Sequence, residues 1–424
     1  MTTASRLRRV IALLAAVSWT AGAQKLPPIP RLIRDIRIDA TQHDITSIGA
    51  AVPLPDGGIA FVEPKAFRLR FFDRSGNEIV KFGQRGSRIG EFDMVGVRID
   101  PPQAPVDLGR IGDSVWAFNA RRFTFLSPDG KLLRAIALPD KLPDPTIVPT
   151  RRPEPSPQRQ LLTFQTRALL PDGAILGLAS WGHVEAADAQ RTRGVIDSGQ
   201  GFAIASADGD VTRVVARLPD NLSFVQIDSA GLRLMATSIP FVEPPYVSIA
   251  NDGSRIAFGE TTIESPTSGT LRITVIGLGG DTLLTRVMPF TPDPISKRTA
   301  DSAVALRMTA FRPTPGSKTP FARVTPAHAD ELEAKLRARM PLAASPYHGL
   351  TIGADHTLWI SLPRGQDGAR YLVLDEYAQP LRVIVAPIGS GVVTRVSTRS
   401  VVWMTQVDAN RWPSLVRYHV PGSR

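Results

Sequence analysis

A tight turn of the Asp-Gly type recurs along this chain, and each copy is followed by a short apolar strand. The first copy is Pro55-Asp56-Gly57-Gly58. The others are Ile111-Gly112-Asp113, Pro171-Asp172-Gly173, Asn251-Asp252-Gly253 and Ala354-Asp355-His356. Aspartate accepts backbone hydrogen bonds in such turns, and glycine adopts a positive φ without steric cost. Self-similarity at this spacing predicts a repeated β architecture.

Each repeat contains further strands in a fixed order. The strands after the first turns cover residues 59–62, 115–118, 175–178, 256–259, 358–361 and 401–404. They are almost continuously apolar, which is typical of strands buried on both faces. A variable gap, another strand and a second turn follow. The last strand of each unit is more polar, as at Glu78–Phe82. Alternating polarity is typical of an outer, half-exposed strand.

This order predicts an all-β chain that folds as a six-bladed β-propeller. Five units are complete, and a sixth, near Val392 to Val420, lacks its outer strand. The segment Leu32–Ile38 is similar to the outer strand Leu132–Leu138. We therefore expect Leu32–Ile38 to pair with the strand around Leu415 to Val420 and to close the ring, since closure hides edge strands.

One repeat carries a more specific signature, in Phe71–Gly76 and Phe82–Phe92. The Phe-Gly, Gly and Phe positions after its last strand resemble the NHL repeat. The other units are similar to looser blades of extracytoplasmic six-bladed propellers, including TolB-like domains. The resemblance spans about residues 31 to 421 and implies a fold, but little chemistry, because propellers host many functions.

A segment at about residues 291–345 interrupts the pattern between the fourth and fifth blades. Thr325-Pro326 is a favourable helix start, and Leu332, Leu336 and Met340 then recur every fourth residue. An earlier helix is expected over Asp301–Met308. We interpret this insertion as a packing patch over one end of the channel, with a moving lid as the alternative. Residues 141–160, rich in proline and arginine, are expected to form an exposed loop.

The N-terminus has the features of a secretory signal peptide. Three arginines precede an apolar core at Val10–Val17, and Ala21-Gly22-Ala23 suits a signal peptidase. A membrane anchor is the alternative, but the apolar run is shorter than the roughly 20 residues that span a bilayer. We expect residues 1–23 to be removed, residues 24–424 to form one propeller domain, and the protein to be periplasmic or secreted.

Composition narrows the function classes. The chain has no cysteine, which excludes disulfides, thiolate ligands and thiol nucleophiles, and 43% hydrophobic residues predict a large core. The net charge is +11, and loss of Arg6, Arg8 and Arg9 with the leader makes it +8. Because these charges are scattered, we expect no nucleic-acid binding. No segment after the leader is apolar enough to cross a membrane, so we expect no transmembrane segment, and we expect a monomer.

Catalytic motifs are not evident. The six histidines show no metal-binding spacing, and neither a Gly-x-Ser-x-Gly elbow nor a phosphate-binding loop is present. The sequence therefore predicts no cofactor, although a propeller can assemble a divalent-cation site from distant blades.

The connections from the second to the third strand of each blade should emerge on one face of the ring. A face with convergent polar groups is the default binding-site hypothesis, and the alternative is that these loops are simply polar. The candidate binding residues are Glu63, Asn119, Arg121, Trp181, His183, Glu260, Arg364, Asp367, Gln406 and Asp408. No catalytic or metal-ligating residue is assigned.

Two functions follow from these observations. The first is an exported, non-enzymatic scaffold that binds a protein or a small molecule in the cell envelope. The alternative is an enzyme sited in the channel, such as a lactonase-like hydrolase or a lyase, with or without a divalent ion.

Overall fold

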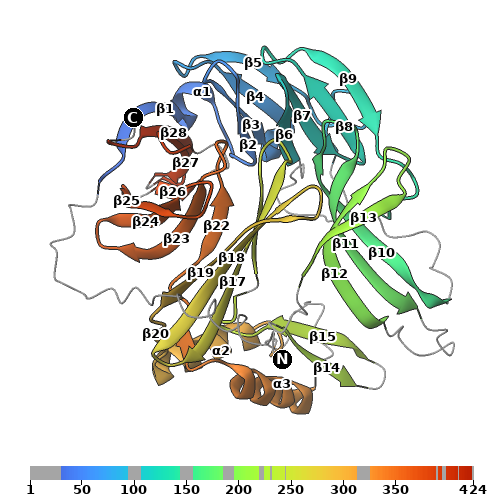
Figure 1. Cartoon of the computed structure of the whole chain (residues 1–424), viewed down its shortest axis with the longest axis vertical. Helices are drawn as coiled ribbons and strands as arrows, with labels where there is room; N and C mark the ends of the chain where they lie inside the picture. Colours follow the sequence, from blue (N-terminus) through green and yellow to red (C-terminus); the bar gives the residue numbers. More distant parts are fainter. Residues whose placement is uncertain are drawn as a thin grey trace, which may run out of the picture.

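A computed structural model describes six four-stranded antiparallel sheets arranged as the blades of a propeller (Figure 1). The residues it describes are 30–93, 107–143, 156–184, 195–218, 224–229, 232–243, 245–312, 325–387, 390–393, 398–408 and 410–422. The expected signal peptide lies outside them. Among the described residues, no helix is both long and apolar enough to cross a membrane.

The blades follow one another along the chain, and each is a meander of neighbouring strands. Blades 1 to 3 are β2 (Ala51–Pro53), β3 (Ile59–Glu63), β4 (Arg68–Phe72) and β5 (Glu78–Phe82); β6 (Asp107–Ile111), β7 (Ser114–Asn119), β8 (Arg122–Leu126) and β9 (Leu132–Ala137); and β10 (Ser156–Leu169), β11 (Ile175–Val184), β12 (Val195–Ala205) and β13 (Val211–Arg217).

Blades 4 to 6 follow the same order, except that blade 6 takes its outer strand from the start of the chain. They are β16 (Tyr246–Ile249), β17 (Arg255–Ser265), β18 (Ser268–Gly277) and β19 (Thr282–Phe290); β22 (Gly349–Ile352), β23 (Leu358–Gly365), β24 (Gly368–Leu374) and β25 (Pro380–Ala386); and β26 (Ser390–Val393), β27 (Val401–Val407), β28 (Pro413–His419) and β1 (Ile33–Asp39).

The predicted closure of the ring is confirmed. Strand β1 pairs antiparallel with β28, from Ile33 opposite His419 to Asp39 opposite Ser414. The carboxylate of Asp35 accepts a hydrogen bond from Nε of Arg417 at 2.7 Å and lies 3.1 Å from Nε2 of His419. Sheet pairing and an ion pair therefore both tie the first described strand to the last.

Apolar side chains hold every pair of neighbouring blades together. One buried cluster joins blades 2, 3 and 4, and four others join blades 1 and 2, 4 and 5, 5 and 6, and 6 and 1. At the join of blades 6 and 1, Ile38 and Leu415 are fully buried against Phe61 and Phe72. The core is thus a ring of interfaces between sheets, which explains why the apolar strands lack simple alternation.

The turns between the first and second strands adopt the predicted conformation. In four of them an aspartate Oδ1 accepts the backbone N–H two residues later, at 3.0 to 3.2 Å; these residues are Asp56, Asp172, Asp252 and Asp355. The residue after the aspartate has a positive φ. It is glycine in the first three of these turns, but His356 in blade 5, with φ of 63°.

The loop after β5 is locally closed around Phe92. Gly83 has φ of 96°, and a Cβ there would lie 2.4 Å from the Phe92 ring. The backbone N–H of Phe92 donates to the carbonyl of Gln84 at 2.8 Å, and Gly86 N–H donates to the Phe92 carbonyl at 3.0 Å. The Phe-Gly, Gly and Phe positions therefore form a compact loop after the outer strand of blade 1.

The helical insertion is confirmed between blades 4 and 5. It contains α2 (Lys297–Met308) and α3 (Pro326–Arg339), and a two-strand pair, β20 (Asp293–Pro294) with β21 (Ala343–Ala344), lies at its base. Thr325 caps α3 as predicted, with Pro326 in the first turn. The earlier helix starts at Lys297 instead of Asp301, because the Ser296 side chain caps it.

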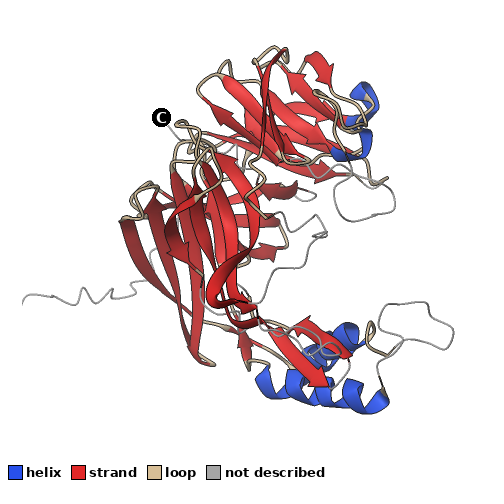
Figure 2. Cartoon of the chain, turned by 90° about the vertical axis from the view of Figure 1, so that its right-hand side faces the viewer, coloured by secondary structure: helices blue, strands red, loops and turns tan. Residues whose placement is uncertain are grey.

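The insertion has a small core of its own. Leu332 and Leu336 of α3 and Val304 of α2 are fully buried together with Ile239, which follows a hairpin that the sequence did not predict. This hairpin is β14 (Phe224–Ser229) with β15 (Leu232–Ser238). Figures 1 and 2 show the helices and the hairpin side by side at the lower end of the molecule. The insertion is therefore a packed unit built with the hairpin.

Other expectations require correction. Residues 156–160, expected in an exposed loop, begin the long strand β10, while residues 144–155 lie outside the described residues. The short helix α1 (Ala40–His43) and the 3-10 turn η1 (Pro64–Ala66) were not predicted. The four-stranded blade is confirmed, but no residues were assigned to its first strand, which in blade 1 is β2, only three residues long and without a periodic signal.

Candidate functional site

The connections between the second and third strands of the blades lie at one end of the sheets, because every blade has the same strand order. Nine of the ten candidate binding residues have described side chains. That of His183 lies outside the described residues, although its backbone continues β11 opposite Ile196. The contacts of the other nine differ strongly from blade to blade.

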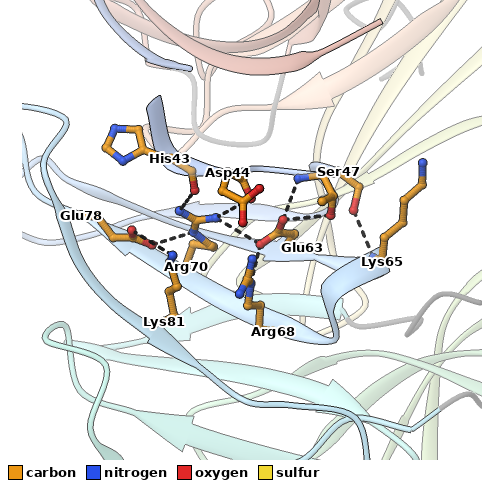
Figure 3. A network of polar contacts seen from close by, with 10 residues as sticks. His43, Asp44, Ser47, Glu63, Lys65, Arg68, Arg70, Glu78 and Lys81 are labelled. Atoms are coloured by element: carbon orange, nitrogen blue, oxygen red, sulfur yellow. Dashed lines mark hydrogen bonds and ion pairs between the residues drawn. The ribbon is translucent and has the colours of Figure 1, made fainter. Parts of the chain in front are cut away.

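Glu63 ends β3 and is fully buried. Its Oε1 accepts the backbone N–H of Thr46 at 2.7 Å and the Thr46 hydroxyl at 2.9 Å, and its Oε2 accepts Nε of Arg68 at 2.7 Å (Figure 3). Burial raises the pKa of Glu63, but the hydrogen bonds from Arg68 and Thr46 outweigh it and lower the pKa below its ordinary value. The carboxylate is thus ionised and already occupied.

The other part of this network is Arg70, which is also fully buried. Its Nη1 lies 3.2 Å from Glu63 Oε2, its Nη2 donates to the carbonyl of His43 at 2.6 Å, and its Nε lies 2.7 Å from a Glu78 oxygen (Figure 3). His43 belongs to the segment that connects β1 to β2. The network therefore anchors the closing segment of the ring to blade 1.

Asn119 and Arg121 also hold backbone in place. Asn119 is buried, accepts the Asp93 N–H at 2.8 Å and donates to the Asp93 carbonyl at 3.1 Å. Arg121 has φ of 60° in the tight turn after β7, and its guanidinium donates to the carbonyls of Leu142 and Pro139 at 2.8 and 2.7 Å. Both side chains fix connections between blades.

Trp181 is half-buried and packs against the apolar cluster of blades 2 to 4. It lies inside its strand, because β11 continues to Val184. The strongly exposed tryptophan among the described residues is instead Trp412, with 47% of its surface accessible. It lies in the connection between β27 and β28, and no strand pattern marked it in the sequence.

Blades 5 and 6 present the remaining polar residues at this end. Arg364 lies near the end of β23, and Asp367 pairs with Arg370 at 3.1 Å in the following turn. Gln406 donates to the Tyr418 hydroxyl at 2.5 Å. The Asp408 carboxylate accepts the Trp412 N–H at 2.8 Å, which shapes a tight turn. These groups have structural partners as well as solvent contact.

Glu260 differs from the other candidates. It follows the buried run Ile256–Gly259 of β17 and is half-buried. No hydrogen bond or ion pair involves its carboxylate within the part of the chain that the structure describes. A half-buried carboxylate without a partner is unusual, because desolvation of a charge costs free energy unless a partner compensates for it.

Glu260 and the residue before it face opposite sides of blade 4. The residue before it, Gly259, pairs with Tyr246 of β16, and a Cβ on Gly259 would lie 3.2 Å from the Tyr246 ring and 3.5 Å from Leu350 of blade 5. The Tyr246 hydroxyl donates to the carbonyl of Tyr347. Burial, and then the charge of Glu243, raise the pKa of Tyr246, so the phenol stays protonated. Because side chains alternate along a strand, Glu260 points to the opposite face of β17, on which Ile256 and Phe258 pack toward blade 3, and it lies opposite Arg272 of β18.

No metal centre emerges from the described residues, because no group of three or more His, Asp or Glu side chains among them could hold an ion. At Glu260 the described residues offer a carboxylate, a group that is suitable for proton transfer.

Comparison with family models and with curated proteins finds no match, so neither the NHL nor the TolB resemblance gains support. Solved structures similar to this chain include a streptogramin B lyase, at 12% identity over 92% of this chain and 97% of that one, with a TM-score of 0.34. A gluconolactonase from Xanthomonas campestris matches at 10% identity over 93% and 99%, with a TM-score of 0.32. The calcium-binding protein regucalcin from Agrobacterium tumefaciens matches at 12% over 93% and 96%, with a TM-score of 0.34.

These comparisons correct one expectation. The main hypothesis was a non-enzymatic scaffold, but the similar structures include a lyase and a gluconolactonase, which agree with the enzyme alternative instead. Likeness at this identity and overlap assigns no residue role, so any role in this chain has to be argued from its own side chains.

Proposed function

We propose that this propeller is an enzyme that acts on a small molecule near the end of the buried run of β17 in blade 4, with Glu260 as its general base. One observation supports this proposal above the others: Glu260 is half-buried and has no hydrogen bond or ion pair among the described residues. Glu63, in the corresponding position of blade 1, is held by Thr46, Arg68 and Arg70. The same position thus serves structure in one blade and is available for chemistry in another.

The proposed chemistry is proton abstraction, either from water that attacks an ester or lactone, or from an acidic C–H bond in an elimination. In both cases a carboxylate takes the proton.

The test is a turnover screen of the purified chain with lactones, aryl esters and substrates for elimination, with and without added divalent ions. Glu260→Gln should lower kcat/KM of any activity found by about 10²- to 10⁴-fold. The matched control is Glu264→Gln, on the same strand but exposed, which should leave activity unchanged. An activity that survives Glu260→Gln, or is lost equally in both variants, would contradict the role of Glu260.

We also propose that the protein acts outside the cytoplasm. The basic start, the apolar run Val10–Val17 and the small residues Ala21-Gly22-Ala23 support export. Cell fractionation with N-terminal sequencing should find the mature chain outside the cytoplasm, beginning at Gln24. Full-length chain retained in the cytoplasm would contradict the proposal.

A further inference from the structure

The turn between the first two strands of blade 5 departs from its counterparts in blades 1, 3 and 4. Gly57, Gly173 and Gly253 occupy the left-handed position of those turns, with φ of 87°, 84° and 71°. Blade 5 has His356 there, with φ of 63°. Left-handed backbone favours glycine, and histidine is among the other residues that adopt it more often than most.

The imidazole of His356 makes contacts with the equivalent turn of blade 4. Its Nε2 lies 3.3 Å from Oγ of Ser254 and 3.5 Å from Oδ2 of Asp252. The Ser254 hydroxyl donates to Asp252 Oδ1 at 2.7 Å, so its proton is already committed and Nε2 of His356 acts as the donor. Because a single ring nitrogen faces both Asp252 and Ser254, this is not the arrangement of a catalytic triad, in which the two ring nitrogens have separate partners.

The charges around this contact are few and defined. From blade 4, Asp252 faces the ring; within the turn of blade 5 the nearest acid is Asp355. The second oxygen of Asp355 is held by the Arg399 N–H of blade 6 at 2.8 Å and lies 3.8 Å from the Arg399 Nε. Asp252 is thus the acid that a charge on the histidine stabilises most. Burial raises the pKa of Asp252, but the hydrogen bonds from Ser254 and the proximity of His356 outweigh burial and lower the pKa below its ordinary value. The carboxyl therefore stays ionised in mild acid.

We infer that His356 and Asp252 form a pH-sensitive clasp between blades 4 and 5, closed when the imidazole is charged and weakened when it is neutral. The chain leaves the ring for the helical insertion between β19 and β22, at this same pair of blades. The clasp therefore ties together the two blades whose chain connection is interrupted by other structure. Histidine is the side chain whose charge ordinarily changes between about pH 5 and 8.

The sign of the effect follows from the contact. A charged imidazole has an ionised partner in the folded protein and loses it on opening, so protonation stabilises the closed seam. The stabilisation is present in mild acid and is lost as the pH rises and the ring becomes neutral. Since the pair is partly exposed, with 24% and 57% of the His356 and Asp252 side chains accessible, the effect is modest.

A double-mutant cycle with His356→Gln and Asp252→Asn tests the clasp in the full chain. Amide hydrogen exchange of the peptides that cover β16 and β22 reports opening of this seam, and each variant is compared with wild type at the same pH. At about pH 5.5 the coupling between the two positions should be about twofold to fivefold in the opening equilibrium, and at about pH 8 it should vanish. Equal coupling at both pH values, or no coupling at pH 5.5, would overturn the proposal.

A third variant separates the contact from the backbone conformation. His356→Gly restores the residue that the other turns use and removes the left-handed penalty. It should close the seam more firmly than wild type at about pH 8, and this advantage should shrink or reverse at about pH 5.5, where wild type has the clasp. An advantage of the same size at both pH values would show that the histidine contributes strain alone and would overturn the clasp.

Discussion

Blade 6 is completed by a strand pairing that spans almost the whole chain, it packs against blade 1 through apolar side chains, and a buried ionic network secures the segment that follows β1. Blade 4 meets blade 5 across a chain connection that contains two helices, and its polar contacts are half-exposed. At the first seam the carboxylate of Glu63 has four hydrogen-bond donors, whereas Glu260, in the corresponding position of blade 4, has none among the described residues. The same strand position thus holds a carboxylate with protein partners in blade 1 and a carboxylate without them in blade 4.

The difference has a physical basis. Buried charges are tolerated when hydrogen bonds satisfy them completely, and such a network then resists any change of geometry. Half-exposed groups can exchange partners with water, a substrate or a proton at little cost. We therefore expect perturbations of the blade 6 and 1 seam to affect folding, and perturbations of the blade 4 and 5 region to affect local opening or activity.

The largest effect should come from removing β1. A chain that starts at Thr41 loses the outer strand of blade 6, including the fully buried Ile38, and exposes the edge of β28. We expect a loss comparable to the whole stability of a domain, about 5–15 kcal/mol, and aggregation. Thermal melting and size-exclusion chromatography measure this, with a chain that starts at Pro30 as the control. Equal melting temperatures for the two chains would contradict the role of β1 in closure.

Next in size is Arg70→Met. It removes the cation that faces Glu63 and Glu78 and releases the His43 carbonyl, which leaves a buried carboxylate with fewer partners. Breaking a buried pair in this way costs about 3–5 kcal/mol, measured by urea unfolding. The control is Arg74→Met in the exposed turn of the same blade, which should change stability by about 0.5 kcal/mol or less. Similar losses in the two variants would show that the network has no special weight.

Leu336→Ala tests whether the insertion is a separate unit. Leu336 is fully buried in the small cluster of α2, α3 and Ile239, and its truncation should destabilise that cluster by about 2–5 kcal/mol. Hydrogen exchange should increase in α2 and α3 while the blades remain protected. The exposed Leu306 of α2 provides the control, as Leu306→Ala. Uniform loss of protection across the blades would show that the insertion and the ring unfold together.

The sequence predicted the repeat better than the site, and the reasons lie in particular residues. Leu32–Ile38 was identified as the closing strand because it resembles an outer strand elsewhere in the chain. Such similarity can be recognised from the sequence alone. The Glu63 network depends on Thr46 and Arg70, which come together only through strand pairing and the loop after α1. Glu63 was therefore proposed as a binding residue although its carboxylate is occupied by the protein. The hairpin β14–β15 was missed because its strands belong to no blade.

The smallest expected effect concerns the pH dependence of the closing seam, and it bears most directly on the contrast with Glu260. The pKa of Glu63 is lowered from its ordinary value of 4.5 by the donors around it. A carboxyl whose pKa is lower in the folded state stabilises the protein above the pKa of the unfolded state, and the contribution disappears as the pH falls through the folded value. Glu63→Gln should therefore lower the free energy of unfolding by about 1–3 kcal/mol at neutral pH, and its difference from wild type should shrink below about pH 4. Glu264→Gln, exposed on β17, should show no such trend. A Glu63→Gln deficit that stays constant from neutral pH to pH 3 would mean that the hydrogen-bonding shape of the side chain matters and its charge does not, and the contrast between an occupied and an available carboxylate would then rest on geometry alone.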